Sequence, residues 1–258
     1  MIRLIASDID GTLLFHGPDD PSDIDPAVFA EIRRLKEKGI LFCPASGRQY
    51  SSLRRIFGPV ADELYYICSN GAVVFGPGDP GPVLRVTEME RDGAIKLAEE
   101  ILAIPQCEVV LCGERTSYFC PKHDDYMQLF LDLAGKEMQV LPALEDMPEP
   151  ITKVTAYCRE GTREPEALLA PRWQRFHPAV SGPVWLDFTQ ADKGIGLAQL
   201  ADALGIDRSE VMAFGDNYND IPMLEYAGRP YLMETADPPL LERFPNHCHR
   251  VEEILRTL

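Results

Sequence analysis

Short apolar segments that end in polar clusters alternate with helical patterns at both ends of the chain, and this alternation restricts the possible folds strongly. Residues 2–7 form an apolar run that predicts a buried strand, and residues 40–45 and 65–68 predict two more. Between the first two, Asp25 can cap a helix that Gly39 ends. Strands that alternate with helices predict a parallel sheet with right-handed crossovers, which is a Rossmann-like α/β fold.

The middle of the chain has a different pattern. The stretch GPGDPGP at 76–82 is rich in proline and glycine, as linkers are. Short strand-like runs and two helical patterns follow it, which predicts an α+β unit. The expected strands cover 108–111, 118–120, 138–141 and 153–157, and the expected helices cover 91–102 and 125–133. The α/β alternation returns with a helix at 193–204 and a strand at 211–214. We therefore expect a core domain of residues 1–81 and 188–258 that encloses an inserted domain of residues 82–187.

The chain is strongly acidic, because 25 Lys and Arg residues stand against 41 Asp and Glu residues for a net charge of −16. Such a surface repels nucleic-acid phosphates and anionic membranes, so we expect neither as a partner. An anionic substrate must then meet local positive charge from a few basic side chains or a bound cation. The sequence has no apolar run of the roughly 20 residues that a membrane helix needs and no signal-peptide pattern at its N-terminus, so we expect a cytoplasmic protein.

Four polar clusters follow predicted strands or open a predicted helix. In chain order they are Asp8-Ile9-Asp10-Gly11-Thr12-Leu13, Ala45-Ser46-Gly47-Arg48, Asp192-Lys193-Gly194 and Gly215-Asp216-Asn217-Tyr218-Asn219-Asp220. For most of these clusters taken alone, a turn, a loop or a helix cap is the better explanation. In open α/β sheets, however, ligands gather outside the carboxyl ends of the strands. The occurrence of all four at the ends of one predicted sheet therefore indicates a functional site.

These clusters resemble the four motifs of the haloacid dehalogenase superfamily of phosphotransferases, and within it the Cof-type branch. The resemblance covers the whole chain, because that branch carries an α+β insert between its second and third motifs as a C2B-type cap. Ser69-Asn70-Gly71-Ala72 also looks like the segment that follows the third strand in this branch. The departures are mild: Ser46 stands where Thr is also common, and Gln49 stands where many members have Pro. The resemblance implies a HAD-like core with a cap domain that determines substrate specificity.

The first cluster places two carboxylates two residues apart on one loop, where they can take different roles. Asp8, at the strand end, is the candidate nucleophile, which would attack phosphorus and form an aspartyl-phosphate. Asp10 is the candidate general acid and base, which would protonate the departing alcohol and later activate water. A carboxylate that attacks a phosphate dianion meets electrostatic repulsion, and a hard divalent cation such as Mg²⁺ would remove it.

The resemblance also implies which residues hold this cation. They are Asp8, the backbone carbonyl of Asp10, and Asp216, with Asn219 and Asp220 at the edge of the coordination shell. Helix capping is the competing interpretation of Asp216 and Asn219.

The phosphoryl group itself requires fixed hydrogen-bond donors around its oxygens. Ser46 would supply a hydroxyl, Gly47 would let the backbone approach closely, and Lys193 would add a point charge that also orients Asp8. We also assign Asn219 to this phosphate-binding group.

Other polar residues keep more than one interpretation. Arg48 either contacts the substrate or pairs with an acidic residue of the loop. Thr12 is interpreted as a hydroxyl that structures its loop. Four residues of the insert could line a substrate pocket but are more often solvated on such a surface, so we do not assign them to the site: Arg115, Tyr118, Lys122 and His123.

The sequence therefore predicts a Mg²⁺-dependent hydrolase that removes phosphate from small phosphorylated metabolites, sugar phosphates above all by resemblance. Two alternatives stay open: a phosphomutase of sugar phosphates, and a non-catalytic regulatory protein that senses phosphate or metal. Asp10 and the large insert argue against the regulatory protein, because a receiver domain uses neither a leaving-group acid nor a lid. The sequence does not define an oligomeric state, and a monomer is compatible with it.

Overall fold

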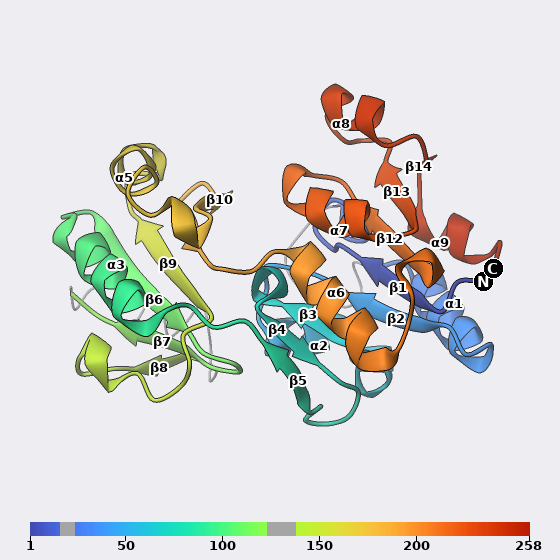
Figure 1. Ribbon diagram of the computed structural model, residues 1–258, viewed down its shortest axis with the longest axis horizontal. Helices are drawn as coiled ribbons and strands as arrows, with labels where there is room; N and C mark the ends of the chain where they lie inside the picture. The colour runs from blue at the N-terminus through green and yellow to red at the C-terminus, as the bar shows by residue number, and fades with distance from the viewer. Residues whose placement is uncertain (16–23, 123–137) are drawn as a thin grey trace. The chain divides into compact units, whose positions relative to one another are not determined.

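The computed structural model describes residues 1–15, 24–122 and 138–258, and it divides into two compact units (Figure 1). The first unit comprises Met1–Arg85 and Asp192–Leu258, and the second comprises Val86–Ala191. The helix expected at 125–133 and the candidate His123 lie outside the described residues. None of the helices in the described part is long and apolar enough to cross a membrane.

The first unit is built on a five-stranded sheet in the order β14-β13-β12-β1-β2, whose neighbouring strands are all parallel. Its strands are β1 (Leu4–Ser7), β2 (Leu41–Pro44), β12 (Val211–Gly215), β13 (Arg229–Met233) and β14 (His247–Cys248). A parallel bridge between Ala45 and Ile67 places β3 (Tyr66–Cys68) beside β2. β3 belongs to a small sheet with β4 (Val73–Phe75) and β5 (Val83–Val86). The predicted α/β fold is confirmed, and β1 lies between β2 and β12.

The helices of this unit begin and end where local chemistry favours it. They are α1 (Pro26–Glu37), α2 (Tyr50–Ile56), α6 (Lys193–Leu204), α7 (Ile221–Tyr226), α8 (Pro238–Arg243) and α9 (Val251–Leu255). The predicted cap of α1 is confirmed, because the Asp25 carboxylate accepts a hydrogen bond from the Ala27 N–H at 2.8 Å. At the other end Gly39 adopts a φ of 76°, which ends the helix. Asp192 caps α6 in the same way through the Ile195 N–H, and so fixes where Lys193 begins the helix.

Alternate residues of the central strands enter the two faces of the sheet. On one face Leu4 and Ala6 pack with Leu197 of α6 and Leu224 of α7 in a buried apolar core. On the other face a cluster of aromatic rings covers the sheet, with Phe57 placed 6.4 Å from Phe42 and 6.2 Å from Phe29. Because both faces are covered, the strands read as continuous apolar runs in the sequence.

The second unit has a six-stranded sheet in the order β10-β11-β9-β6-β7-β8. Its elements are α3 (Arg91–Ala103), β6 (Cys107–Cys112), β7 (Ser117–Cys120), β8 (Met138–Val140), β9 (Lys153–Cys158), α5 (Arg163–Leu169), β10 (Ala179–Gly182) and β11 (Trp185–Phe188). The helix expected at 91–102 and the four expected strands are confirmed as α3, β6, β7, β8 and β9. The elements α5, β10 and β11 were not predicted from the sequence. α5 is a short helix of seven residues with Pro165 in its first turn, and β10 is exposed and poor in strand-forming residues.

A buried ion pair joins two strands of this sheet. The Lys153 ammonium lies 3.1 Å from Asp187 Oδ2, and the Thr155 hydroxyl donates to Asp187 Oδ1 at 2.6 Å. All three residues are buried. Burial by itself would lower the pKa of Lys153, but the Asp187 carboxylate raises it above the ordinary value. The sheet of the second unit therefore contains an ion pair that is shielded from water.

We predict that Lys153→Met lowers the free energy of unfolding by about 3 to 5 kcal/mol, because Asp187 would remain buried without a cation. The measurement is urea unfolding. The matched control is Lys36→Met, which removes a half-exposed partner of Glu63 and should have an effect below about 1 kcal/mol. A loss from Lys153→Met no larger than that of the control would contradict the prediction.

Candidate active site

The loop that follows β1 is held by hydrogen bonds within its own backbone. The N–H groups of Leu13 and Leu14 both donate to the Ile9 carbonyl at 2.8 Å, and Gly11 adopts a φ of 91°. The N–H of Asp8 donates to the Phe214 carbonyl at 2.9 Å, which ties the loop to β12. This arrangement holds the Asp8 side chain at the carboxyl end of the sheet.

Asp8 is buried and is hydrogen-bonded through both carboxylate oxygens. Its Oδ1 lies 2.5 Å from the ammonium of Lys193, and its Oδ2 accepts a hydrogen bond from the Thr12 hydroxyl at 3.2 Å. Thr12 therefore structures this loop, as the sequence predicted.

Lys193, the first residue of α6, is also buried and bridges two carboxylates. Its ammonium lies 2.5 Å from Asp8 Oδ1 and 2.6 Å from Asp220 Oδ1. Burial alone would lower the pKa of Lys193, but Asp220 and Asp8 together raise it above its ordinary value. The side chain is therefore a fixed positive charge at neutral pH.

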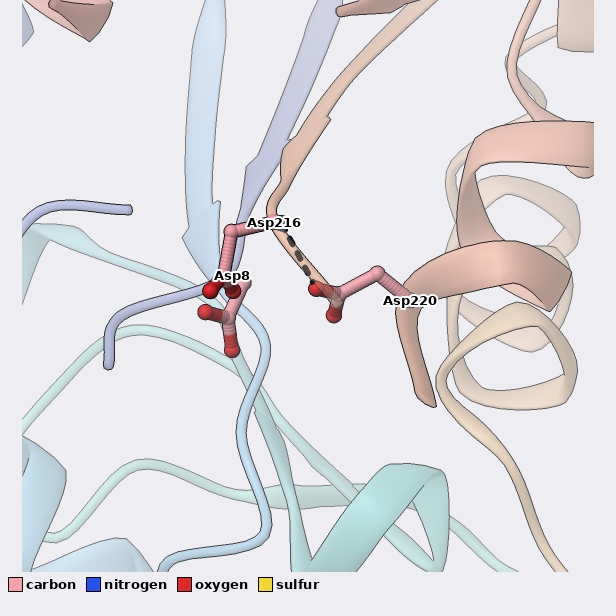
Figure 2. Close-up of side chains that lie close together, drawn as sticks. All are labelled: Asp8, Asp216 and Asp220. Carbon is pink, nitrogen blue, oxygen red and sulfur yellow. Dashed lines mark hydrogen bonds between the residues drawn. The ribbon is translucent and has the colours of Figure 1, made fainter. Parts of the chain in front are cut away.

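Three carboxylates gather beside this lysine. Oxygen atoms of Asp8, Asp216 and Asp220 all lie within 4.8 Å of one another. Figure 2 shows the carboxylates of Asp8 and Asp216 side by side, with Asp220 approaching from the next turn of the chain. Asp220 Oδ2 accepts hydrogen bonds from the Asp216 N–H at 3.0 Å and the Asn217 N–H at 3.1 Å. Asp220 is thus engaged with Lys193 and the backbone, which leaves Asp8 and Asp216 as the pair that face each other.

The chemistry of this cluster fits a divalent cation. Burial and the Asp220 carboxylate raise the pKa of Asp8 to about 7 and that of Asp216 to about 6, although the Lys193 ammonium acts in the opposite direction on both. Two ionised carboxylates this close repel each other, so the ionisation of both costs free energy unless a proton or a cation lies between them. Hard cations prefer such oxygen donors. Asp8 and Asp216 would hold the ion, and Asp220 would orient Lys193 and the loop.

Asp10 does not join the cluster with its side chain. The Arg48 guanidinium donates to it twice, from Nε to Oδ2 at 2.9 Å and from Nη2 to Oδ1 at 2.6 Å. Of the two interpretations of Arg48, the structure therefore has the pairing with an acidic residue of the loop. A bidentate pair of this kind fixes the orientation of the carboxylate. The predicted metal contact of Asp10 involves its backbone carbonyl, not this side chain.

The other candidate phosphate-binding residues occupy two loops. Ser46 is buried, and its hydroxyl accepts a hydrogen bond from the Arg48 N–H at 3.3 Å. A Cβ added at Gly47 would lie 3.0 Å from Asn70 Oδ1, so this position has little room for a side chain. Asn219 is exposed in a one-turn helix and makes no hydrogen bond through its side chain to any part of the chain that the structure describes. The phosphate contacts of these residues stay predictions.

Two candidates from the insert are held by contacts within the second unit. Tyr118 is buried, and its hydroxyl donates to Glu149. The Lys122 ammonium donates to the carbonyls of Leu102 and Ile104 at 2.8 Å, where it satisfies the C-terminal end of α3. These contacts give both side chains a structural role.

The structure gives Asp220 a contact that the sequence did not predict. We expected it at the edge of a metal shell, and it also lies fully buried against Lys193. The available signal was its spacing, four residues after Asp216 across one helical turn, which lets its carboxylate reach back to the N–H groups before it.

We predict that Gly11→Ala abolishes divalent-cation binding while the fold persists. The new Cβ would lie 2.2 Å from Asp216 Oδ2, so that carboxylate must move. The matched control is Gly39→Ala, which has the same strained φ region but no atom within 4 Å and should cost about 1 kcal/mol of stability. The measurement is the rise in melting temperature on addition of MgCl₂, which the control should retain. An undiminished rise in Gly11→Ala would show that Asp216 is not a ligand.

Comparisons with known proteins agree with this geometry. The family model for haloacid dehalogenase-like hydrolases matches residues 5–253. A 5-amino-6-(5-phospho-D-ribitylamino)uracil phosphatase of Escherichia coli strain K12 is 29% identical over 245 residues, which cover 91% of this chain and 86% of that protein. An HMP-PP phosphatase of Citrobacter koseri is 26% identical over 263 residues, with coverage of 96% and 92%.

Solved structures agree as well. A crystal structure from Eubacterium rectale superimposes with a TM-score of 0.84 at 30% identity and covers 99% of this chain and 98% of its own. A structure from Thermotoga maritima, at 22% identity and a TM-score of 0.81, covers 100% and 98% and shares the fold. The resemblance that the four motifs carry is therefore confirmed, and the chain belongs to the haloacid dehalogenase-like hydrolases.

Proposed function

We propose that this hydrolase is a Mg²⁺-dependent phosphatase of small phosphorylated metabolites that works through an aspartyl-phosphate. The observation that carries the proposal is the buried Asp8 carboxylate, held at 2.5 Å by the Lys193 ammonium and flanked by Asp216. A carboxylate that is desolvated, oriented and beside a fixed cation is suited to act as a nucleophile.

In the first step, an Asp8 oxygen attacks phosphorus and the ester P–O bond breaks. The phosphoryl group passes to Asp8, and the proton that the departing alkoxide needs comes from Asp10. In the free site the Arg48 guanidinium donates to both oxygens of Asp10, so one of these hydrogen bonds must be given up by the oxygen that carries the proton.

In the second step, Asp10 takes a proton from water, whose oxygen attacks the phosphorus of the aspartyl-phosphate. The acyl–phosphate bond breaks and releases inorganic phosphate, and Asp8 regains its carboxylate. Lys193, the Ser46 hydroxyl and the Gly47 N–H would stabilise the phosphoryl oxygens in both steps, with Asn219 beside them. A cation held by Asp8, Asp216 and the Asp10 carbonyl would neutralise charge on the phosphoryl oxygens.

The names of two relatives support a class of substrate. One is a 5-amino-6-(5-phospho-D-ribitylamino)uracil phosphatase and the other an HMP-PP phosphatase. We propose a substrate of the same size, a sugar phosphate or a phosphorylated sugar-alcohol derivative. We also propose that residues 82–187 act as the cap that selects the substrate, with the core domain formed by residues 1–81 and 188–258, and that the protein works in the cytoplasm.

The proposal is tested by a phosphate-release screen over sugar phosphates, ribityl phosphates, nucleotides and pyrophosphorylated cofactors, with and without MgCl₂. Release from at least one class in the presence of the metal is expected. A protein that binds the metal but releases phosphate from none would favour the regulatory alternative. Turnover in H₂¹⁸O places the label in the released phosphate for a phosphatase, whereas a phosphomutase returns the phosphoryl group to a sugar hydroxyl without it.

We predict that Asp8→Asn abolishes turnover and that Asp10→Asn lowers kcat by about 10² to 10⁴-fold, because the first removes the nucleophile and the second the general acid. The control is Asp202→Asn on the exposed side of α6, which should keep wild-type kcat and KM. Steady-state kinetics on the best substrate of the screen provides the comparison. Appreciable turnover by Asp8→Asn would exclude the covalent route.

We predict that removal of divalent cations with EDTA eliminates turnover and that MgCl₂ restores it. Since the cation relieves repulsion between Asp8 and Asp216, MgCl₂ should also raise the melting temperature. Asp216→Asn should lose both effects. Full activity after exhaustive chelation would remove the metal from the proposal.

A further inference from the structure

The turn that follows β3 has an unusual backbone. Ser69 and Asn70 adopt φ values of 51° and 56°, and Gly71 follows at 95°. Outside this turn, His177 is the only residue other than glycine with a positive φ in the part of the chain that the structure describes. The Ser69 hydroxyl is also buried without a hydrogen-bond partner. Two strained residues and an unsatisfied hydroxyl cost stability, and such features persist where the surroundings enforce them, often at functional sites.

The turn is bonded to the loop that carries Ser46 and Gly47. The Asn70 N–H donates to the Ser46 carbonyl at 3.0 Å, and the Ser69 N–H donates to the Arg48 carbonyl at 3.0 Å. Both donors belong to the residues that open this left-handed turn. Gly47 is thus held between two carbonyls that face the turn.

The same turn supports the start of α6. A Cβ added at Gly71 would lie 1.9 Å from the Asp192 carbonyl, and one added at Gly196 would lie 2.8 Å from the Gly71 Cα. The helix that carries Lys193 is therefore packed directly on the turn. The turn contacts both elements to which the proposed function assigns phosphate-binding groups.

These bonds fix the direction of one N–H group. In a trans peptide the C=O of one residue and the N–H of the next point in opposite directions. Since the Ser46 carbonyl points to the turn after β3, the Gly47 N–H points the other way. β2 lies between β3 on one side and β1 on the other, so this direction leads toward the end of β1, where Asp8 lies.

We propose that Asn70 is a positioning residue, whose left-handed backbone turns the Ser46–Gly47 peptide so that the Gly47 N–H faces the phosphoryl group bound at Asp8. Asparagine suits this position because it tolerates the left-handed region better than other residues with a side chain. The inference rests on the proposed function for the identity of the bound group. It adds the reason why the Gly47 N–H points toward that group.

The test uses Asn70→Val, which disfavours the left-handed backbone, and Asn70→Gly, which keeps it and removes only the side chain. Inorganic phosphate serves as the probe, as a competitive inhibitor and as a ligand of the ¹⁵N-labelled full chain. We expect Asn70→Val to raise KM and the inhibition constant of phosphate about tenfold with little change in kcat, which corresponds to about 1.4 kcal/mol of strain. Asn70→Gly should restore both constants, and phosphate should shift the Gly47 amide resonance in the wild type but not in Asn70→Val.

The matched control is His177→Val, which imposes the same backbone strain on an exposed residue of the second unit. His177→Val should lower the free energy of unfolding by a similar amount and leave KM and the inhibition constant of phosphate unchanged. Unchanged constants in Asn70→Val, or an equal loss in Asn70→Gly, would overturn the inference. A wild type that hydrolyses no ester but shows the Gly47 shift would contradict the proposed function and leave the positioning role standing.

Discussion

The site depends on one buried interaction, the Lys193 ammonium between the carboxylates of Asp8 and Asp220. A charged group without water requires its partners, because loss of any one leaves an uncompensated charge in the interior. The contacts of Lys193 therefore hold together the loop after β1, the start of α6 and the turn after β12. Asp192 caps α6 at this junction, and glycines lie where the backbones approach closely there.

The charge distribution is compatible with the proposed binding of an anion by a protein with a net charge of −16. In the described site, one positive charge is on Lys193, which lies between the carboxylates of Asp8 and Asp220, and another is on Arg48, which pairs with Asp10. These two charges do not change the acidic character of the surface as a whole. Their effect is local, because electrostatic interactions are stronger where water is excluded. The proposed function therefore requires a local positive charge at one point and not a basic surface.

Much of this could be predicted from the sequence. Asp8 and Lys193 were identified because polar residues at strand ends of a parallel sheet meet at one edge, and the cap at Asp25 followed from residue type alone. Other features depend on tertiary contacts. Whether Arg48 meets Asp10 or a substrate is decided by a side-chain rotamer, and Asp220 is buried only because α6 packs beside it. The exposed strand β10 and the proline-containing α5 carry weak local signals, so packing in the second unit decides them.

The order of the sheet has a consequence for biosynthesis. Leu4 of β1 pairs with Leu41 on one side and with Val211 on the other, so the central strand receives its second neighbour only after the whole second unit has been synthesised. The second unit is a continuous segment, Val86–Ala191, and is complete on the ribosome before then. Until α6 emerges, a nascent chain carries Asp8 without its counter-ion. The proposed nucleophile therefore gains its buried lysine partner only after the whole second unit has been synthesised.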